Sequence, residues 1–134
     1  MTAALTTTAA APTHWHAFAY TGKGWEDREV AKGLAPPTFP PPELATWAAR
    51  RPGLRVFTES EIDEAVAWLD KELSEQVPVD AESFPISVRL EYSRKRLQER
   101  VNRDVWYGYW SKRGLFVTRV LYACTDTDRS KGCA

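Results

Sequence analysis

The feature that most constrains the fold is a β-hairpin near the C-terminal end of the chain. Two segments rich in aromatic and β-branched residues, 104–110 and 115–124, are separated by Ser111-Lys112-Arg113-Gly114. Such runs around a short link that contains glycine are typical of two antiparallel strands, and Gly114 is free to adopt a positive φ. The chain is therefore expected to form an antiparallel or mixed sheet rather than a purely parallel one.

An amphipathic helix over residues 59–76 is the second strong signal. Its apolar residues recur at the spacing of one helix face and are Ile62, Val66, Leu69 and Leu73. Thr58 and Glu61 have the spacing of a capping box, and Pro78 marks the end of the helix. Trp68 lies about a third of a turn from the apolar stripe, so it either flanks the core or contacts a partner.

Short apolar or alternating segments predict three further strands, over residues 14–20, 54–57 and 86–92. A proline-rich connection over residues 35–42 leads into a short helix, and residues 94–103 favour a helical turn over a charged hairpin arm. Together these elements predict an α+β fold. It has a four- or five-stranded antiparallel or mixed sheet with two or three helices packed mainly on one face.

A chain of 134 residues has the length of one domain with a core that needs neither metals nor disulfides. We expect a disordered leader over residues 1–12, a single α+β domain over 13–124 and a flexible C-terminal tail over 125–134. No stretch approaches the roughly 20 apolar residues that span a bilayer, and the leader lacks the features of a secretory signal. The sequence therefore predicts a cytoplasmic protein without membrane contact, in which Cys124 and Cys133 are free thiols. If the chain is exported by another route, a disulfide between them would only constrain the tail.

The formal net charge of zero conceals two oppositely charged segments. Residues 59–82 hold nine acidic residues and one basic residue, whereas residues 83–119 hold nine basic and three acidic residues. Basic residues beside aromatic rings favour nucleic acid, because cations neutralise phosphates and rings stack on unpaired bases. The residues predicted to contact RNA or single-stranded DNA are Arg94, Lys95, Arg96, Arg100, Arg103, Trp106, Trp110, Lys112 and Arg113.

In a competing interpretation, the aromatic residues of this segment are buried and form no binding surface. A strand over 104–110 places Trp106 and Trp110 on one face and the intervening residues on the other, so one row is not required for the core. Both rows could instead be buried, with the arginines paired to the acidic helix. The sequence pI of about 6.7 also lies below the values above about 9 that are common among nucleic-acid-binding domains.

His14 and His16 are the only histidines, and a strand directs both rings to one face. Such a pair can supply two metal ligands or an acid/base group, but the sequence places no third ligand beside it. No established catalytic motif is present. The sequence therefore favours a binding module over an enzyme and predicts no cofactor.

Two further functions stay open. The chain holds six Trp, five Tyr and five Phe, enough to line a cleft for a flat small molecule near His14 and His16. The candidates for the walls of this cleft are Trp15, Trp25, Trp106 and Trp110. An inhibitor or immunity-type protein would instead contact a protein partner through the acidic helix, with Glu61, Glu64 and Trp68.

Overall fold

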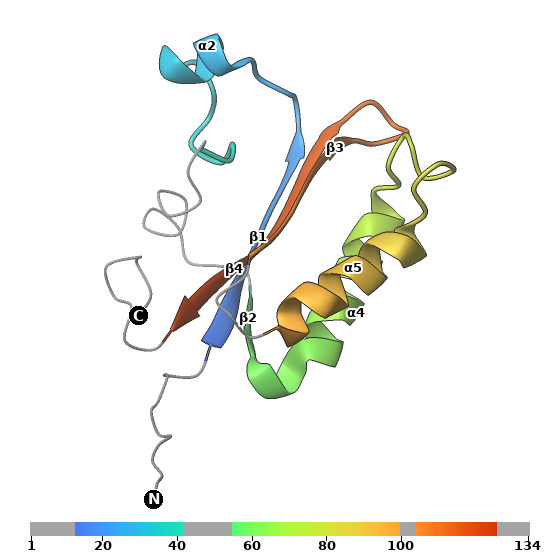
Figure 1. Cartoon of the computed structure of the whole chain (residues 1–134). Coiled ribbons are helices and arrows are strands. Elements are labelled where there is room, and N and C mark those ends of the chain that lie inside the picture. The colour runs from blue at the N-terminus through green and yellow to red at the C-terminus, as the bar shows by residue number, and fades with distance from the viewer. Residues whose placement is uncertain (1–12, 42–54, 100–103, 126–134) are drawn as a thin grey trace, which may run out of the picture.

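The computed structural model describes residues 13–41, 55–99 and 104–125, and Figure 1 draws the others as a thin grey trace. Four strands form one antiparallel sheet in the order β2-β1-β4-β3. The strands are β1 (Thr13–Gly22), β2 (Arg55–Thr58), β3 (Val105–Trp110) and β4 (Phe116–Thr125). The helices of the described ranges are α2 (Asp27–Ala31), α4 (Ile62–Glu75), α5 (Ile86–Gln98) and the short 3-10 helix η1 (Glu59–Glu61).

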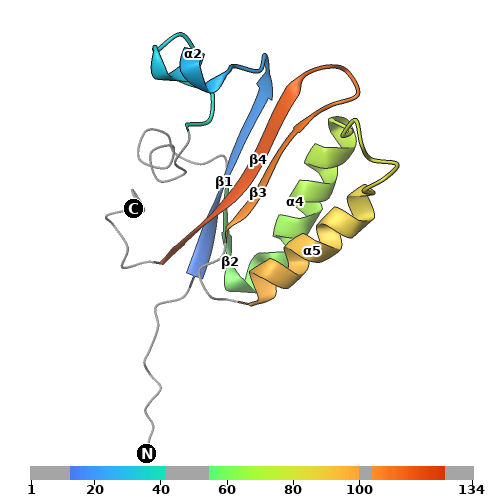
Figure 2. The same cartoon turned by 45° about the horizontal axis from the view of Figure 1, so that its top comes forward.

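The two long helices cover one face of this sheet. Figures 1 and 2 show α4 and α5 side by side against it, whereas α2 lies on the opposite side. We call the face under α4 and α5 the inner face and the opposite one the outer face. The predicted α+β class, with a four-stranded antiparallel sheet and helices mainly on one face, is confirmed.

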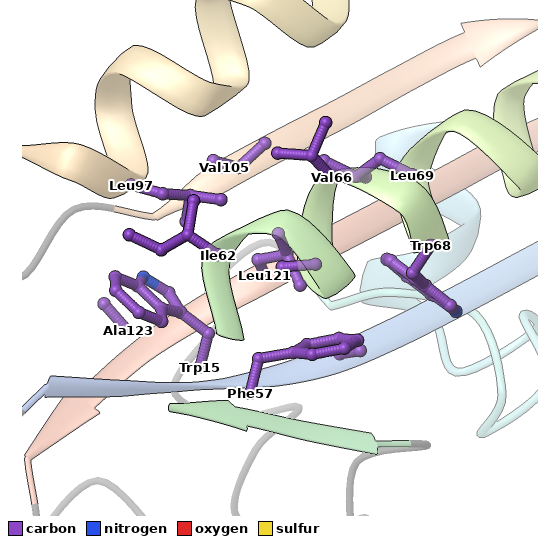
Figure 3. Close-up of a cluster of buried hydrophobic side chains, with 12 residues drawn as sticks. Trp15, Phe57, Ile62, Val66, Trp68, Leu69, Leu97, Val105, Leu121 and Ala123 are labelled. Atoms are coloured by element: carbon purple, nitrogen blue, oxygen red, sulfur yellow. The ribbon is translucent and has the colours of Figure 1, made fainter. Parts of the chain in front are cut away.

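The main core lies between the inner face and α4 (Figure 3). Trp15 of β1, Phe57 of β2 and Leu121 of β4 are fully buried there. The apolar stripe predicted for the helix is buried along its length and comprises Ile62, Val66, Leu69 and Leu73. Trp68 is only 8% exposed, with its ring centroid 6.3 Å from that of Phe57. Trp68 therefore flanks the core and is not an exposed contact residue.

Residues 86–92 are helical, so the strand predicted there is wrong. They form the first half of α5, whose buried side chains recur every fourth residue at Arg89, Ser93 and Leu97. The alternation of apolar residues was misleading, because Val88 and Tyr92 are about half exposed and the buried face carries an arginine. Arg89 can be buried because its guanidinium donates to the Asp80 carboxylate at 2.5 Å.

A second buried arginine joins α4 to the sheet. Arg119 of β4 is 5% exposed, and its Nε donates to Oε1 of Glu72 at 2.8 Å. The same guanidinium donates to the backbone oxygen of Tyr20 and to the hydroxyl of Thr21 in β1. A guanidinium that is both ion-paired and hydrogen-bonded can be buried without an uncompensated charge.

Cys124 corrects another expectation. It is disulfide-bonded, so the prediction that it is a free thiol is wrong. Cys133, the only other cysteine in the sequence, lies outside the described residues. Disulfides persist mainly in oxidising compartments. The cytoplasmic location therefore stays a prediction that this bond does not support.

Several other expectations fall outside the described ranges. They concern the leader over 1–12, the helix after the proline-rich connection, most of the tail over 125–134, and the side chains of Arg100 and Arg103. Within the part of the chain that is described, no helix combines the length and the apolar character needed to cross a membrane.

Candidate binding sites on the outer face of the sheet

Strand β3 presents two tryptophans on the outer face. Trp106 and Trp110 are 52% and 51% exposed, whereas the alternate residues Val105, Tyr107 and Tyr109 face the inner side. The Tyr109 hydroxyl donates to the carbonyl oxygen of Gln76 at 2.7 Å, and burial raises the pKa of Tyr109 to about 12. One row of β3 therefore belongs to the core side, and the other is open. The interpretation in which both rows are buried does not hold.

The exposed indoles border two hollows between the outer face and residues 23–41. Their volumes are about 470 and 280 Å³, and they share Trp25, Phe39 and Phe116. We define the aromatic groove by the five rings that line the two hollows: Trp25, Phe39, Trp106, Trp110 and Phe116. Together the hollows have the size of a small-molecule site, which is typically about 300–1,000 Å³.

Contacts between rings shape one side of the aromatic groove. Phe39 stacks on Phe116 with the centroids 5.8 Å apart, and Trp110 meets Phe116 edge-on at 5.5 Å. Tyr20 of β1 packs edge-on against Phe39 at 5.1 Å. Four rings thus form a continuous row from β1 across β4 to the end of β3. Such offset and edge-to-face pairs contribute roughly 0.5–1.5 kcal/mol each beyond the area they bury.

The loop after β1 is fitted closely to this row. The Tyr20 hydroxyl donates to the carbonyl oxygen of Lys23 at 2.8 Å, which holds the loop that leads to Trp25. Gly24 allows the backbone to approach Trp110, because a Cβ atom at this position would lie 2.4 Å from Cη2 of the indole. The absence of a side chain at Gly24 therefore helps to set the position of Trp110.

Two buried polar atoms of the lining residues have no hydrogen-bond partner among the described residues. They are Nε1 of Trp25 and Oγ1 of Thr118, a residue that is 1% exposed and lines the larger hollow. An unpaired buried polar group costs about 1–3 kcal/mol, so such groups are uncommon. An indole N–H can only donate, whereas a hydroxyl can donate or accept. Nε1 of Trp25 and Oγ1 of Thr118 are thus one donor and one group of either kind, on residues that line the aromatic groove, whose hydrogen-bonding capacity the described residues leave unused.

The rim of the aromatic groove carries charged groups from the segment that covers it. Asp27 lines the larger hollow, and Glu26 lines the smaller one. Glu26 forms an exposed ion pair with Arg28 at 3.2 Å, and the Lys23 ammonium lies 4.2 Å from the centroid of the Trp25 ring. Carboxylates on this side favour a ligand group that donates hydrogen bonds or carries positive charge.

The basic residues of α5 are not on the face that bears the two indoles. Arg94, Lys95 and Arg96 belong to the helix on the inner side of the sheet. Arg94 forms an ion pair with Asp63 of α4, so part of the basic segment neutralises the acidic helix within the fold. The fold therefore separates Arg94 and Lys95 from the indoles, although these residues lie close together in the sequence.

A smaller group of cations does adjoin the indoles. Arg96 shares a hollow of about 380 Å³ with Trp106 at the edge of β3. At the other end of this strand, Lys112 and Arg113 are exposed in the hairpin link that follows Trp110. The described residues of the predicted nucleic-acid surface that lie along this sheet edge are therefore Arg96, Trp106, Trp110, Lys112 and Arg113.

The two histidines form a separate cluster. His14 pairs with Cys124 across β1 and β4, and the Nε2 atoms of His14 and His16 are 3.2 Å apart. One ligand atom from each of the three residues lies within 4.8 Å of the other two. Burial, and to a smaller extent His14, lowers the pKa of His16. The sheet register thus places beside the two histidines a third residue with a potential ligand atom, which sequence spacing does not reveal.

The aromatic groove lies far from this cluster, and a cleft near His14 and His16 stays a prediction. His16 pairs with Tyr122, whereas Gly22 at the end of the same strand pairs with Phe116 in the groove. Six residues of extended strand span roughly 20 Å. The cluster and the groove are therefore two distinct sites on the outer face.

The acidic helix provides a third surface. The predicted capping box is confirmed, since Oε1 of Glu61 accepts the backbone N–H of Thr58 at 2.9 Å. Hydrogen bonds from the Thr58 backbone and hydroxyl lower the pKa of Glu61. Glu64 and Trp68 line a hollow of about 450 Å³ beside α4. Because Trp68 leaves little surface open there, contact with a protein partner stays a prediction.

Sequence reasoning named three of the five groove rings, Trp25, Trp106 and Trp110, whereas the fourth candidate, Trp15, lies in the core. Phe39 and Phe116 were missed. Phe116 faces Trp110 across the hairpin, so the register of the predicted hairpin is the signal that would have found it. No comparable signal exists for Phe39, which reaches the groove through a non-local fold of the chain.

Comparison with known proteins found no match to a protein-family model, to a curated protein or to a solved structure. The function is therefore argued from the geometry and chemistry of the sites themselves.

Proposed function

We propose that the protein is a non-enzymatic binding module that holds a flat heteroaromatic molecule in the aromatic groove. One observation carries the proposal: the groove combines five rings with two buried polar atoms, on Trp25 and Thr118, that lack partners within the described residues. Rings supply a stacking surface, and a few polar atoms fix the orientation of a ligand. This combination is typical of small-molecule sites.

The polar groups indicate the class of ligand. The Trp25 N–H requires an acceptor, such as a ring nitrogen. Asp27 and Glu26 require a donor, such as an exocyclic amine, and they disfavour an anionic group. An amino-substituted heteroaromatic ring meets these requirements, and the adenine ring of a nucleoside is an example. The carboxylates favour a nucleoside over a nucleotide.

The lining of the aromatic groove supports binding rather than catalysis. Among the described residues of the two hollows, the titratable side chains are Asp27 and Glu26. Both are exposed, and Glu26 is engaged by Arg28. Catalytic acids, bases and nucleophiles are usually partly buried groups activated by a neighbour.

Calorimetric titration with adenosine and with purine riboside, which lacks only the exocyclic amine, tests the proposal. We expect adenosine to bind at one site per chain. Purine riboside should bind about tenfold more weakly, because a hydrogen bond to a carboxylate contributes roughly 1.5 kcal/mol or more. In the Asp27→Asn variant the preference should shrink. Failure of wild-type protein to bind adenosine at millimolar concentration would reject the proposal.

Single-stranded nucleic acid is the second candidate, because of the line of cations and indoles along β3. Trp106 and Trp110 lie four residues apart, with Arg96 beside the first and the Lys112–Arg113 pair after the second. Four residues of strand span roughly 13 Å, which allows two or three unpaired bases to follow the indoles.

The salt dependence of binding separates the two candidates. Three cations on the backbone of a single strand give a slope of about −2 in log K against log salt, and all seven cations of the predicted surface would give about −5. Adenosine binding should show almost no salt dependence. We expect an oligonucleotide, if it binds, to show the smaller slope and to lose affinity in the Lys112→Glu, Arg113→Glu variant. A slope near −5 would contradict this assignment of the contacts.

A further inference from the structure

The cluster of His14, His16 and Cys124 has the composition of a metal site. The two histidines are separated by one residue in β1, so both rings project to the outer face. Cys124 lies opposite His14 on the neighbouring strand, is fully buried and belongs to the outer-face apolar cluster with Phe18 and Tyr122. Two adjacent rigid strands therefore hold two imidazoles and one sulfur together. This site is independent of the aromatic groove.

The separation of the two imidazole nitrogens agrees with that of a zinc centre, and the sulfur lies close enough to reach a shared ion by a small movement. A tetrahedral zinc ion with Zn–N bonds of about 2.0–2.1 Å holds two nitrogen ligands about 3.3–3.4 Å apart. The Nε2 atoms of His14 and His16 are 3.2 Å apart, and the Cys124 sulfur completes a group in which the three ligand atoms lie within 4.8 Å of one another. Imidazole nitrogen with thiolate sulfur is a donor set that zinc prefers.

The disulfide determines whether the sulfur can act as a ligand. A thiolate binds zinc, whereas a sulfur in a disulfide has no negative charge to donate. In the structure Cys124 is disulfide-bonded. The three potential ligands thus lie together, but the sulfur is not in the oxidation state that binds zinc.

We propose that His14, His16 and Cys124 form a zinc site that becomes competent when the Cys124 disulfide is reduced. A dithiol reductant transfers two electrons and two protons to the disulfide, which yields two thiols while the reductant becomes a disulfide. Zinc then binds the Cys124 sulfur as a thiolate, and the thiol proton leaves to the solvent. Cys124 would then belong to a disulfide under oxidising conditions and to a metal site under reducing conditions.

A hydrogen bond between the two imidazoles also accounts for a separation of 3.2 Å. That alternative involves neither the sulfur nor its oxidation state. The two explanations therefore differ in whether tight metal binding requires the Cys124 thiol.

Two single substitutions form a matched test. Cys124→Ser and Cys133→Ser both remove the disulfide, but only Cys133→Ser retains the Cys124 sulfur, as a thiol that needs no reductant. Zinc affinity is measured by competition with a chromophoric chelator, and Co²⁺ serves as a spectroscopic probe. We expect Cys133→Ser to bind one zinc ion per chain at least about a hundredfold more tightly than Cys124→Ser, since even outer-sphere changes cost about 10–100-fold. Its cobalt complex should show thiolate-to-metal charge-transfer absorption.

A histidine substitution and reduction of the wild-type protein test the same site independently. In the Cys133→Ser background, His16→Ala should abolish tight binding and the charge-transfer band. Wild-type protein should gain zinc affinity after reduction with a phosphine and removal of the reductant, which also serves if either serine variant fails to fold. Equal affinities of Cys124→Ser and Cys133→Ser, or unchanged zinc binding by the wild type after reduction, would overturn the proposal.

Discussion

Replacing Trp106 with alanine tests the aromatic groove quantitatively. The side chain is 52% exposed, which leaves roughly 130 Å² of the ~250 Å² available to a tryptophan. A flat ring stacked on one indole face covers about half of this and buries a similar area of its own, so roughly 120 Å² is removed from water, worth ~3 kcal/mol. Alanine substitutions at stacking sites cost about 1–3 kcal/mol. We therefore expect adenosine to bind roughly 5- to 150-fold more weakly to Trp106→Ala.

The assay is calorimetric titration of wild-type protein, Trp106→Ala and a control, Tyr92→Ala, with urea unfolding to confirm that each variant is folded. Tyr92 is a suitable control because it is 55% exposed but lies on α5, outside the aromatic groove. It does line the hollow of Arg96 and Trp106, so its loss should weaken nucleic-acid binding and leave adenosine binding intact. Adenosine affinity of Trp106→Ala within about threefold of the wild type, below the stacking contribution, would refute the reasoning.

Four further predictions concern Gly24, Arg119, Tyr109 and His16. Gly24→Ala should weaken adenosine binding with little change in the urea midpoint, because its Cβ would lie 2.4 Å from Cη2 of Trp110 and displace the ring; unchanged affinity would contradict this. Arg119→Leu should lower the free energy of unfolding in urea by about 3 kcal/mol, since the partly buried carboxylate of Glu72 loses its partner. Tyr109 stays protonated in the folded state up to about pH 12, whereas in the unfolded chain it ionises near pH 10. Stability should therefore fall as the pH rises through this interval, and less so in Tyr109→Phe. The pKa of His16 is lowered in the folded state, so the stability that this group contributes above about pH 6.5 should be lost as the pH falls through the lowered value. In thermal unfolding measured across this pH range, His16→Gln should show a smaller loss of stability at acid pH than the wild type.

The parts of the fold that local patterns specify were predictable from the sequence. The stripe from Ile62 to Leu73 repeats at helical spacing, and the capping box of Thr58 and Glu61 marks where the helix begins. Gly114 adopts a φ of 81° in the hairpin link, as the turn requires. Each of these signals depends on residues within a few positions of one another, which is the range over which sequence patterns determine conformation.

The features that sequence reasoning missed depend on distant partners. Arg89 can be buried only because its guanidinium is paired with Asp80 and the loop before the helix, which local patterns do not reveal. Residues 86–92 therefore alternate like a strand in sequence, although they form a helix. The sulfur of Cys124 lies beside His14 because β1 and β4 are neighbours in the sheet, 110 positions apart in sequence. The aromatic groove likewise requires residues 23–41 to lie over the outer face. Patterns along the chain identified its indoles but not their arrangement.

The central claim, that the aromatic groove is the binding site, is tested most directly by the indole N–H signals in a ¹H–¹⁵N NMR titration with adenosine. Five tryptophans lie in the described residues, three in the groove and two in the core, so the core indoles act as internal controls. We expect the signals of Trp25, Trp106 and Trp110 to shift with the Trp25 signal moving downfield as its N–H gains an acceptor, while those of Trp15 and Trp68 stay in place. Shifts confined to Trp15 or Trp68, or no shift at saturating adenosine, would contradict the account.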